Sequence, residues 1–194
     1  MFFSIFEQHL ITDPRWKQLI EQRTRLKEGS LEFWLDKNLD SPAWWTMLGI
    51  LLILVFVWWK LVDKTRFLEI VCCGLMSGLL FTIVDSIASE QVVWAYPSKL
   101  TPLPYSLLLG DLTLLPLIYM GLYQYCRSWK AYLVAAFIAA LFLAFVLEPL
   151  AVRLEVFQML NWEYGYSFVL YSVKALFIKW AMEGIKALQR NATN

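Results

Sequence analysis

Apolar residues gather along this chain into long runs separated by short polar segments. A run of roughly 20 mostly apolar residues is long enough to cross the hydrocarbon core of a bilayer as a helix. Five runs have this character, over residues 43–62, 67–88, 104–125, 131–152 and 164–184. The last is the least apolar, because it contains Lys174, Lys179 and Glu183. The pattern predicts an all-α, polytopic membrane protein: a five-helix transmembrane bundle over 43–186, followed by a short tail over 187–194.

The first 42 residues follow a different pattern. The stretch "TDPRW" predicts a helix start, with Asp13 as the cap and Pro14 in the first turn. Apolar residues then recur at helical spacing, Gly29 indicates a stop, and Ser30 indicates a second cap. We interpret residues 1–42 as a peripheral amphipathic helical segment that lies on the bilayer. A helix that binds a protein partner is the alternative.

Basic residues set the expected orientation. They occur in the first loop, in the third loop and at the end of the fifth run, as Lys60, Lys64 and Arg66, then Arg127 and Lys130, then Lys179, Lys186 and Arg190. Short loops rich in Lys and Arg stay in the cytoplasm. We therefore expect the N-terminus outside and the C-terminus in the cytoplasm. Trp and Tyr cluster where the runs end, as expected of an interfacial aromatic belt.

Composition excludes several function classes. The 17 basic and 16 acidic residues nearly balance, so the chain lacks the basic field of a nucleic-acid-binding protein. Its single histidine is His9, and its cysteines, Cys72, Cys73 and Cys126, form no CxxC pair and suit buried apolar thiols. No dinucleotide, P-loop or nucleophile-elbow motif occurs. We expect neither a zinc or other metal site nor a cofactor.

Four of the charged residues within the apolar runs are candidate binding residues, together with one tyrosine. Asp85, Asp111, Glu148 and Lys174 all fall in the outer half of the predicted bundle. Tyr171 shares the helical face of Lys174. Ionisable groups within a bilayer are costly and normally face the interior of a bundle. We expect at least one acid within salt-bridge reach of Lys174. Either a functional polar pocket or a satisfied polar core explains the cluster, and Asp85 alone could instead reach the interface.

Small residues and prolines accompany these charges. They are Gly74 and Gly78 in the second run, Pro116 in the third, and Ala136, Ala140, Ala144 and Pro149 in the fourth. Small residues at four-residue steps let helices approach closely. A proline removes a backbone donor and disturbs the helix near each acid. We expect Glu69 and Glu183, near the cytoplasmic edge, to be solvated, and Lys179 to extend to the near interface.

Several stretches occur in an order that resembles a family. They are "WWKLVDKTRFLEI", "WAYPSKLTPLP", "GDLTLLPLIYMGLYQYCRSWK", "FVLEPL" and "NWEYGYSF". The chain is similar, over about residues 43–183, to small uncharacterised multi-pass membrane proteins of Bacillus, Paenibacillus and Clostridium relatives. The resemblance implies a bacterial plasma membrane and implies no reaction. The family's acidic and Trp positions fall here on Asp85 or Glu90, on Asp111, on Glu148 and on Trp162.

Two function hypotheses follow. The first is a non-enzymatic membrane protein whose acidic pocket binds a small cation, a proton or a lipid headgroup. The alternative is an intramembrane acid–base enzyme, of the cyclase or isomerase type, that acts on a prenyl chain or another lipophilic substrate. The enzyme requires a roomy apolar cavity beside the acids, whereas the binding protein requires only a small polar pocket. Beyond the bilayer, the sequence identifies neither a partner nor an oligomeric state.

Overall fold

The computed structural model of the chain describes residues 11–103 and 107–193, and it confirms the all-α prediction. Three helical stretches are long and apolar enough to cross a membrane. They are α3 (Pro42–Leu61), the stretch of η2 (Lys64–Arg66) and α4 (Phe67–Glu90), and the stretch of α6 (Trp129–Phe142), η4 (Leu143–Leu147) and α7 (Glu148–Arg153).

The third and fifth runs are also helical. The π-helical η3 (Leu107–Leu114) continues directly into α5 (Leu115–Tyr125), and α8 spans Tyr164–Thr193. The predicted start of the third run, at residue 104, lies outside the described residues. Helix α8 continues to Thr193, so the predicted short tail over 187–194 is helical as far as that residue. Good helix formers such as Lys186, Leu188 and Gln189 extend the helix past the apolar run.

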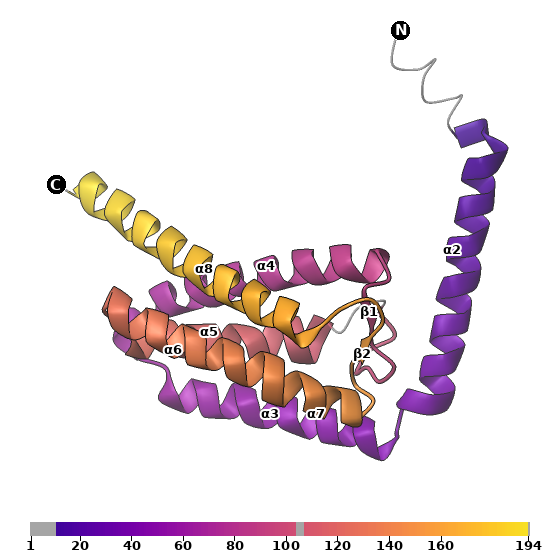
Figure 1. Cartoon of the computed structure of the whole chain (residues 1–194), viewed down its shortest axis with the longest axis horizontal. Helices are drawn as coiled ribbons and strands as arrows, with labels where there is room; N and C mark the ends of the chain where they lie inside the picture. Colours follow the sequence, from indigo (N-terminus) through magenta and orange to yellow (C-terminus); the bar gives the residue numbers. More distant parts are fainter. Residues whose placement is uncertain (1–10, 104–106, 194) are drawn as a thin grey trace, which may run out of the picture.

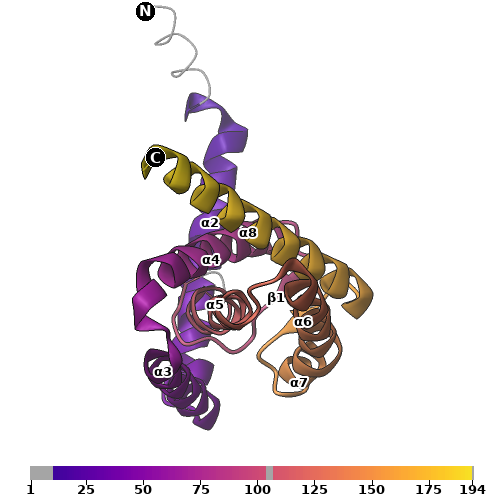
Figure 2. The same ribbon diagram turned by 90° about the vertical axis from the view of Figure 1, so that its left-hand side faces the viewer.

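The helices form an elongated bundle. In Figure 1, α3, α4, α5 and α6 run along the same long direction, α8 crosses them obliquely, and α2 (Pro14–Phe33) stands across one end. Helix α4 packs on α5 and η3, α8 packs on α6 and α4, and α3 packs on η3. Figure 2 looks along the bundle and shows α3 and α7 on either side of a gap.

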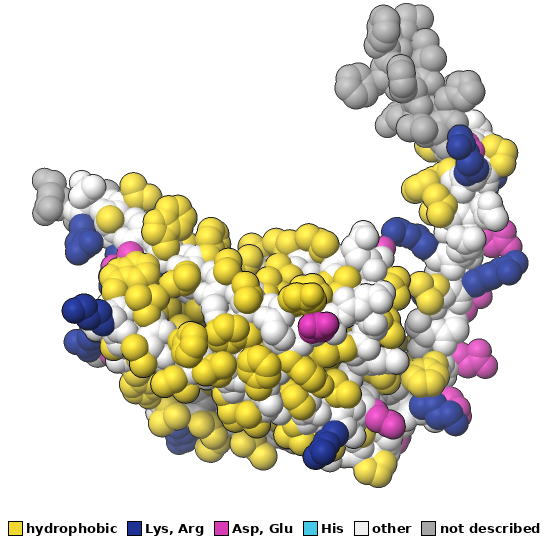
Figure 3. Space-filling model, viewed as in Figure 1, with side chains coloured by type: hydrophobic (Ala, Val, Ile, Leu, Met, Phe, Trp, Pro, Cys, Tyr) yellow, Lys and Arg dark blue, Asp and Glu magenta, His cyan; other side chains and the backbone are white. Residues whose placement is uncertain are grey.

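Two short strands link the loops at the end of the bundle near α2. Strand β1 (Trp94–Ala95) pairs antiparallel with β2 (Gln158–Met159), with Trp94 opposite Met159. We call this the strand end. The opposite end carries most of the loop Lys and Arg residues used in the orientation argument, and we call it the basic end (Figure 3).

Small residues bring the helices together as predicted. Ala140 and Ala144 are fully buried on the face that α8 covers. A Cβ atom on Gly78 would lie 3.3 Å from Leu112 Cδ2 and 3.5 Å from the backbone oxygen of Asp111. The absence of a side chain at Gly78 therefore lets η3 approach α4.

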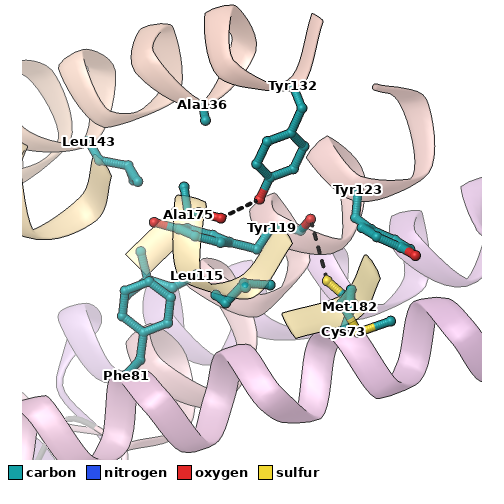
Figure 4. Close-up of a cluster of buried hydrophobic side chains, with 11 residues drawn as sticks. Cys73, Phe81, Leu115, Tyr119, Tyr123, Tyr132, Ala136, Leu143, Ala175 and Met182 are labelled. Atoms are coloured by element: carbon teal, nitrogen blue, oxygen red, sulfur yellow. Dashed lines mark hydrogen bonds between the residues drawn. The ribbon is translucent and has the colours of Figure 1, made fainter. Parts of the chain in front are cut away.

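An aromatic core fills the centre of the bundle (Figure 4). The ring of Tyr119 lies edge-on to Phe81, with centroids 5.1 Å apart. The Tyr132 hydroxyl donates to the backbone oxygen of Ala175 at 3.1 Å, so this buried phenol is satisfied. The three cysteines are free thiols, and Cys73 is buried in this core.

Both π-helical segments inside the bundle come just before a proline. Pro116 follows η3 and Pro149 follows η4. A proline in a helix removes one backbone donor and its ring clashes with the carbonyl four residues earlier. The wider π turn relieves this clash, and such turns frequently occur at functional sites. Asp111 lies within η3 and Glu148 directly follows η4, so each turn sets the direction of an acid.

The start of α2 follows the sequence prediction, but its end does not. Asp13 Oδ1 accepts from the backbone N–H of Arg15 at 2.8 Å. The predicted stop at Gly29 and cap at Ser30 are wrong, because α2 continues to Phe33. One glycine costs only about 1 kcal/mol in a helix, and good helix formers flank it. The second cap is Ser41, whose Oγ accepts from Trp44 N at the start of α3.

The surface of the bundle is apolar. Within α3 only Met47 is buried, and Leu52, Ile53 and Phe56 are each about 60% exposed. Figure 3 shows hydrophobic side chains over most of the visible face of the bundle. A helix that is apolar all round and outward-facing fits a lipid environment.

Candidate functional site

A cavity of about 470 Å³ lies at the strand end of the bundle. Its walls come from α3, α4, η3, η4, α7 and α8, and they are mostly apolar. All five candidate residues from the sequence line it: Asp85, Asp111, Glu148, Tyr171 and Lys174. The four charged side chains belong to four different helical segments, yet each is buried. The cavity is thus apolar for most of its wall and charged over one part.

Asp85 is held by two aromatic donors. Its Oδ1 accepts from Trp94 Nε1 at 2.7 Å and from the Tyr96 hydroxyl. Burial, together with the nearby Asp85 charge, raises the pKa of Tyr96, so its hydroxyl stays protonated and donates. The alternative that Asp85 reaches the interface is wrong: only 3% of it is exposed, because β1 folds back over it.

Asp111 has different surroundings. No side chain of the described residues donates a hydrogen bond to its Oδ2, and the same is true of Asp85 Oδ2. Asp111, on η3, and Asp85, on α4, line the same cavity, and η3 packs on α4. A buried carboxyl without a donor is held most cheaply in its protonated form. Asp111 is therefore better suited than Asp85 to carry a proton.

Glu148 faces α8. Its Oε1 accepts from the Tyr171 hydroxyl at 2.8 Å, and Ser167 lies beside it. The Ser167 Oγ accepts in turn from Trp162 Nε1 at 2.9 Å. The second carboxyl oxygen, Oε2, is buried and has no partner among the described residues. Glu148 is thus positioned by α8 but keeps an unused acceptor.

Lys174 makes no ion pair with any carboxylate of residues 11–103 and 107–193, which corrects the expected salt bridge. Its Nζ lies instead over the ring of Phe81, 4.2 Å from the centroid. The three acids act on it only at longer range. Aromatic donors already hold Asp85 and Glu148, and the ring face gives the ammonium a favourable place without a contact ion pair.

The three carboxyl groups line one cavity. Within the part of the chain that the structure describes, no group of three or more His, Cys, Asp or Glu side chains is arranged to hold a metal ion. The acids come from three helical segments, α4, η3 and α7. The arrangement suits a ligand that extends along the wall better than a single coordinated ion.

The basic end holds a second charged cluster. The predictions that Glu69 is solvated and that Lys179 extends to the near interface are both wrong. Glu69 is half-buried and accepts from Arg66 Nε at 2.9 Å, and it lies 3.0 Å from Lys186 Nζ. Lys179 is only 2% exposed, and its Nζ lies 3.1 Å from Glu183 among aromatic rings. The helices pack closely enough here for these groups to neutralise one another within the bundle.

Several residues of the site escaped the sequence argument. Trp94 and Tyr96 were interpreted as interface markers, although they are the donors to Asp85. The sequence contains a signal for this role, because the N–H donor of Trp94 and the O–H donor of Tyr96 follow Asp85 after about one helical turn and a short loop. The ring of Phe81 beneath Lys174 had no comparable signal, since an aromatic residue in an apolar run is most often core.

Comparisons with protein families, with curated proteins and with solved structures found no match for this chain.

Proposed function

We propose that this chain is an integral membrane protein that binds a lipophilic ligand in the cavity. The polar end of the ligand lies against Asp85, Asp111 and Glu148. Of the three ligands that the sequence leaves open, a small cation, a proton and a lipid headgroup, we therefore propose the lipid headgroup. The observation that carries the proposal is a mostly apolar cavity of about 470 Å³ that ends on buried charges. Ligand pockets of about 300–1,000 Å³ with a few convergent polar groups are typical of small-molecule sites.

We also propose that all five helical runs span the bilayer, with the N-terminus outside and the C-terminus in the cytoplasm. The common direction of α3, α4, α5 and α6, together with the 30-residue length of the oblique α8, supports five spans (Figure 1). The concentration of loop Lys and Arg residues at the basic end supports the orientation. Helix α2 crosses the opposite end, as a helix lying on the outer membrane surface would. The bacterial plasma membrane is proposed from the sequence resemblance alone.

Filling the cavity tests the binding proposal. Met47 lines the cavity from α3, and Met47→Trp should occupy part of it. Phe56→Trp, on the exposed face of the same helix, is the matched control. Native mass spectrometry of protein purified in mild detergent should show a bound lipophile on the wild type and on the control. The Met47→Trp variant should lack it. Equal lipid retention by all three proteins would contradict the proposal.

The enzymatic alternative is favoured by one observation, the unequal surroundings of Asp85 and Asp111. Two neighbouring carboxyls in different environments can divide the roles of acid and base. In an isomerisation, Asp111 would transfer its proton to a carbon–carbon double bond of a prenyl chain. Asp85 or Glu148 would remove a proton from the carbon next to the cation. The double bond moves, and no other reactant is needed.

The enzyme is tested in the membranes of the producing cell. Asp111→Asn should leave the protein folded while a precursor accumulates in lipid extracts, as in a strain that lacks the protein. Polyprenyl lipids that are identical in all three strains would contradict the enzymatic alternative and leave the binding proposal standing.

A further inference from the structure

The cavity opens sideways, between α3 and α7. The cavity is lined by Ile50 on α3, Leu150 on α7 and Leu154 directly after α7, and yet these side chains are 45%, 48% and 60% exposed. They therefore form the rim of an opening. Figure 2 shows the backbones of α3 and α7 apart from each other on this side of the bundle, and α3 packs on the rest of the bundle mainly through η3. The rim is apolar on both sides, so within a bilayer it would face lipid.

The strand end of the cavity is closed by aromatic side chains. Trp94 is only 8% exposed and packs edge-on against Trp162, with centroids 5.2 Å apart. The ring of Phe157 packs against those of Trp94 and Tyr96, with centroid distances of 6.1 Å and 5.5 Å. The pairing of β1 with β2 holds these rings in place. A ligand arriving from water would have to displace this cover, whereas one arriving from lipid would not.

The charges inside the cavity restrict the polar end of the ligand. Three buried acceptors have no donor among residues 11–103 and 107–193: Asp85 Oδ2, Asp111 Oδ2 and Glu148 Oε2. Among these described residues, the one ammonium that lines the cavity is that of Lys174. A ligand that donates hydrogen bonds would satisfy the buried oxygens. A carboxylate or phosphate end would meet the negative charges of Asp85 and Glu148, and like charges placed together cost several kcal/mol.

From the position of the opening and the unpartnered oxygens, we propose that the ligand is a single-chain lipid with an uncharged or cationic donor end, an alcohol or an amine. It enters from the bilayer between α3 and α7. This inference rests on the proposed binding function and adds the class of ligand and its route.

The ligand class is tested with three probes of equal chain length: hexadecanol, hexadecylamine and hexadecanoic acid. Each is added to the full-length protein in lipid nanodiscs, and its retention is measured by native mass spectrometry. Hexadecanol and hexadecylamine should be retained, and hexadecanoic acid should bind more weakly by about tenfold or more, as expected for a like-charge juxtaposition. Equal retention of the acid would overturn the ligand class while leaving the binding function intact.

The route is tested by narrowing the rim. The double variant Ile50→Trp with Leu150→Trp should load hexadecanol several-fold more slowly than the wild type. The control pair is Leu52→Trp with Val146→Trp. Leu52 lies on α3 and Val146 lies on η4, next to α7, and both are exposed and outside the cavity wall. Loading at the wild-type rate by the rim variant would overturn the lateral route. A wild-type protein that retains none of the three probes would contradict the binding function itself, and the inference with it.

Discussion

The ammonium of Lys174 lies over the ring of Phe81 in the cavity wall, 4.2 Å from the centroid of the ring. This contact replaces the ion pair that the sequence indicated. An ammonium on a ring face is stabilised without neutralising a carboxylate. The three acids therefore keep acceptor capacity for a ligand.

A double-mutant cycle on this pair measures the contact. We expect Phe81→Leu to lower the free energy of unfolding by about 2 kcal/mol more in the wild type than in a Lys174→Met background. The desolvated cation–π contact exists only when Lys174 is present, so only there can the substitution of Phe81 remove it. The measurement is chemical unfolding in mixed micelles. Additive losses in the cycle would show that the ring does not stabilise the ammonium.

The Tyr96 hydroxyl should contribute to stability through Asp85. Tyr96→Phe removes one of the two donors to Asp85 Oδ1, and a hydrogen bond to a charged group contributes about 1.5–3 kcal/mol. Tyr166→Phe, at an exposed phenol on α8, is the matched control and should be nearly neutral. Equal losses for the two variants would argue against this role of Tyr96.

The same hydroxyl predicts a pH dependence. The pKa of Tyr96 is raised in the folded protein, mainly by burial. Its contribution to stability is therefore complete below the unfolded pKa of about 10 and is lost as the pH rises above it. Melting temperatures measured from neutral to strongly alkaline pH should fall more steeply for the wild type than for Tyr96→Phe above about pH 10. Parallel curves would mean that other groups cause the alkaline loss.

Gly78 should tolerate a side chain less well than Gly49. A Cβ at Gly78 meets Leu112 and the backbone of Asp111, whereas nothing lies within 4 Å of one at Gly49. We expect Gly78→Ala to destabilise by about 1–3 kcal/mol through overpacking. Gly49→Ala should stabilise by up to about 1 kcal/mol, because alanine is the better helix former. The opposite order of unfolding free energies would contradict the close approach of η3 to α4.

The orientation is tested with reporters. A fusion after Asn194 and an insertion within Lys64–Arg66 should both report the cytoplasm, because Lys and Arg concentrate at the basic end. An insertion next to Glu155, in the loop at the strand end, should report the outside. An extracellular signal from either basic-end reporter would reverse the orientation. The pocket would then lie in the inner half of the bilayer.

Much of the fold follows from local signals in the sequence. The hydropathy pattern predicts most helix boundaries to within a few residues. It does so because a helix that crosses a bilayer needs a continuous run of apolar residues. Asp13 and the alanine ridge before Glu148 behave as their residue types indicate. Gly29 misled because one glycine only weakens a helix, and flanking residues decide whether it ends.

The sequence predicts which residues form the candidate site but not how they are arranged. The position of each acid within its apolar run is enough to place Asp85, Asp111 and Glu148 at a similar depth. Their actual roles depend on tertiary contacts: the fold-back of Trp94 and Tyr96 over Asp85, and the ring under Lys174. The cavity itself depends on the separation of α3 from α7, which no local pattern encodes.

Photocrosslinking tests the central claim most directly. A hexadecanol analogue with a diazirine near its hydroxyl is incorporated into nanodiscs with the wild-type protein, irradiated, and located by peptide mass spectrometry. The account predicts labels on residues of the cavity wall near Asp111 and Tyr171, and it predicts that excess hexadecanol removes them. Labels confined to the outward face of α3 around Leu52 and Phe56, unaffected by competitor, would show that the cavity binds no lipophile and would contradict the account.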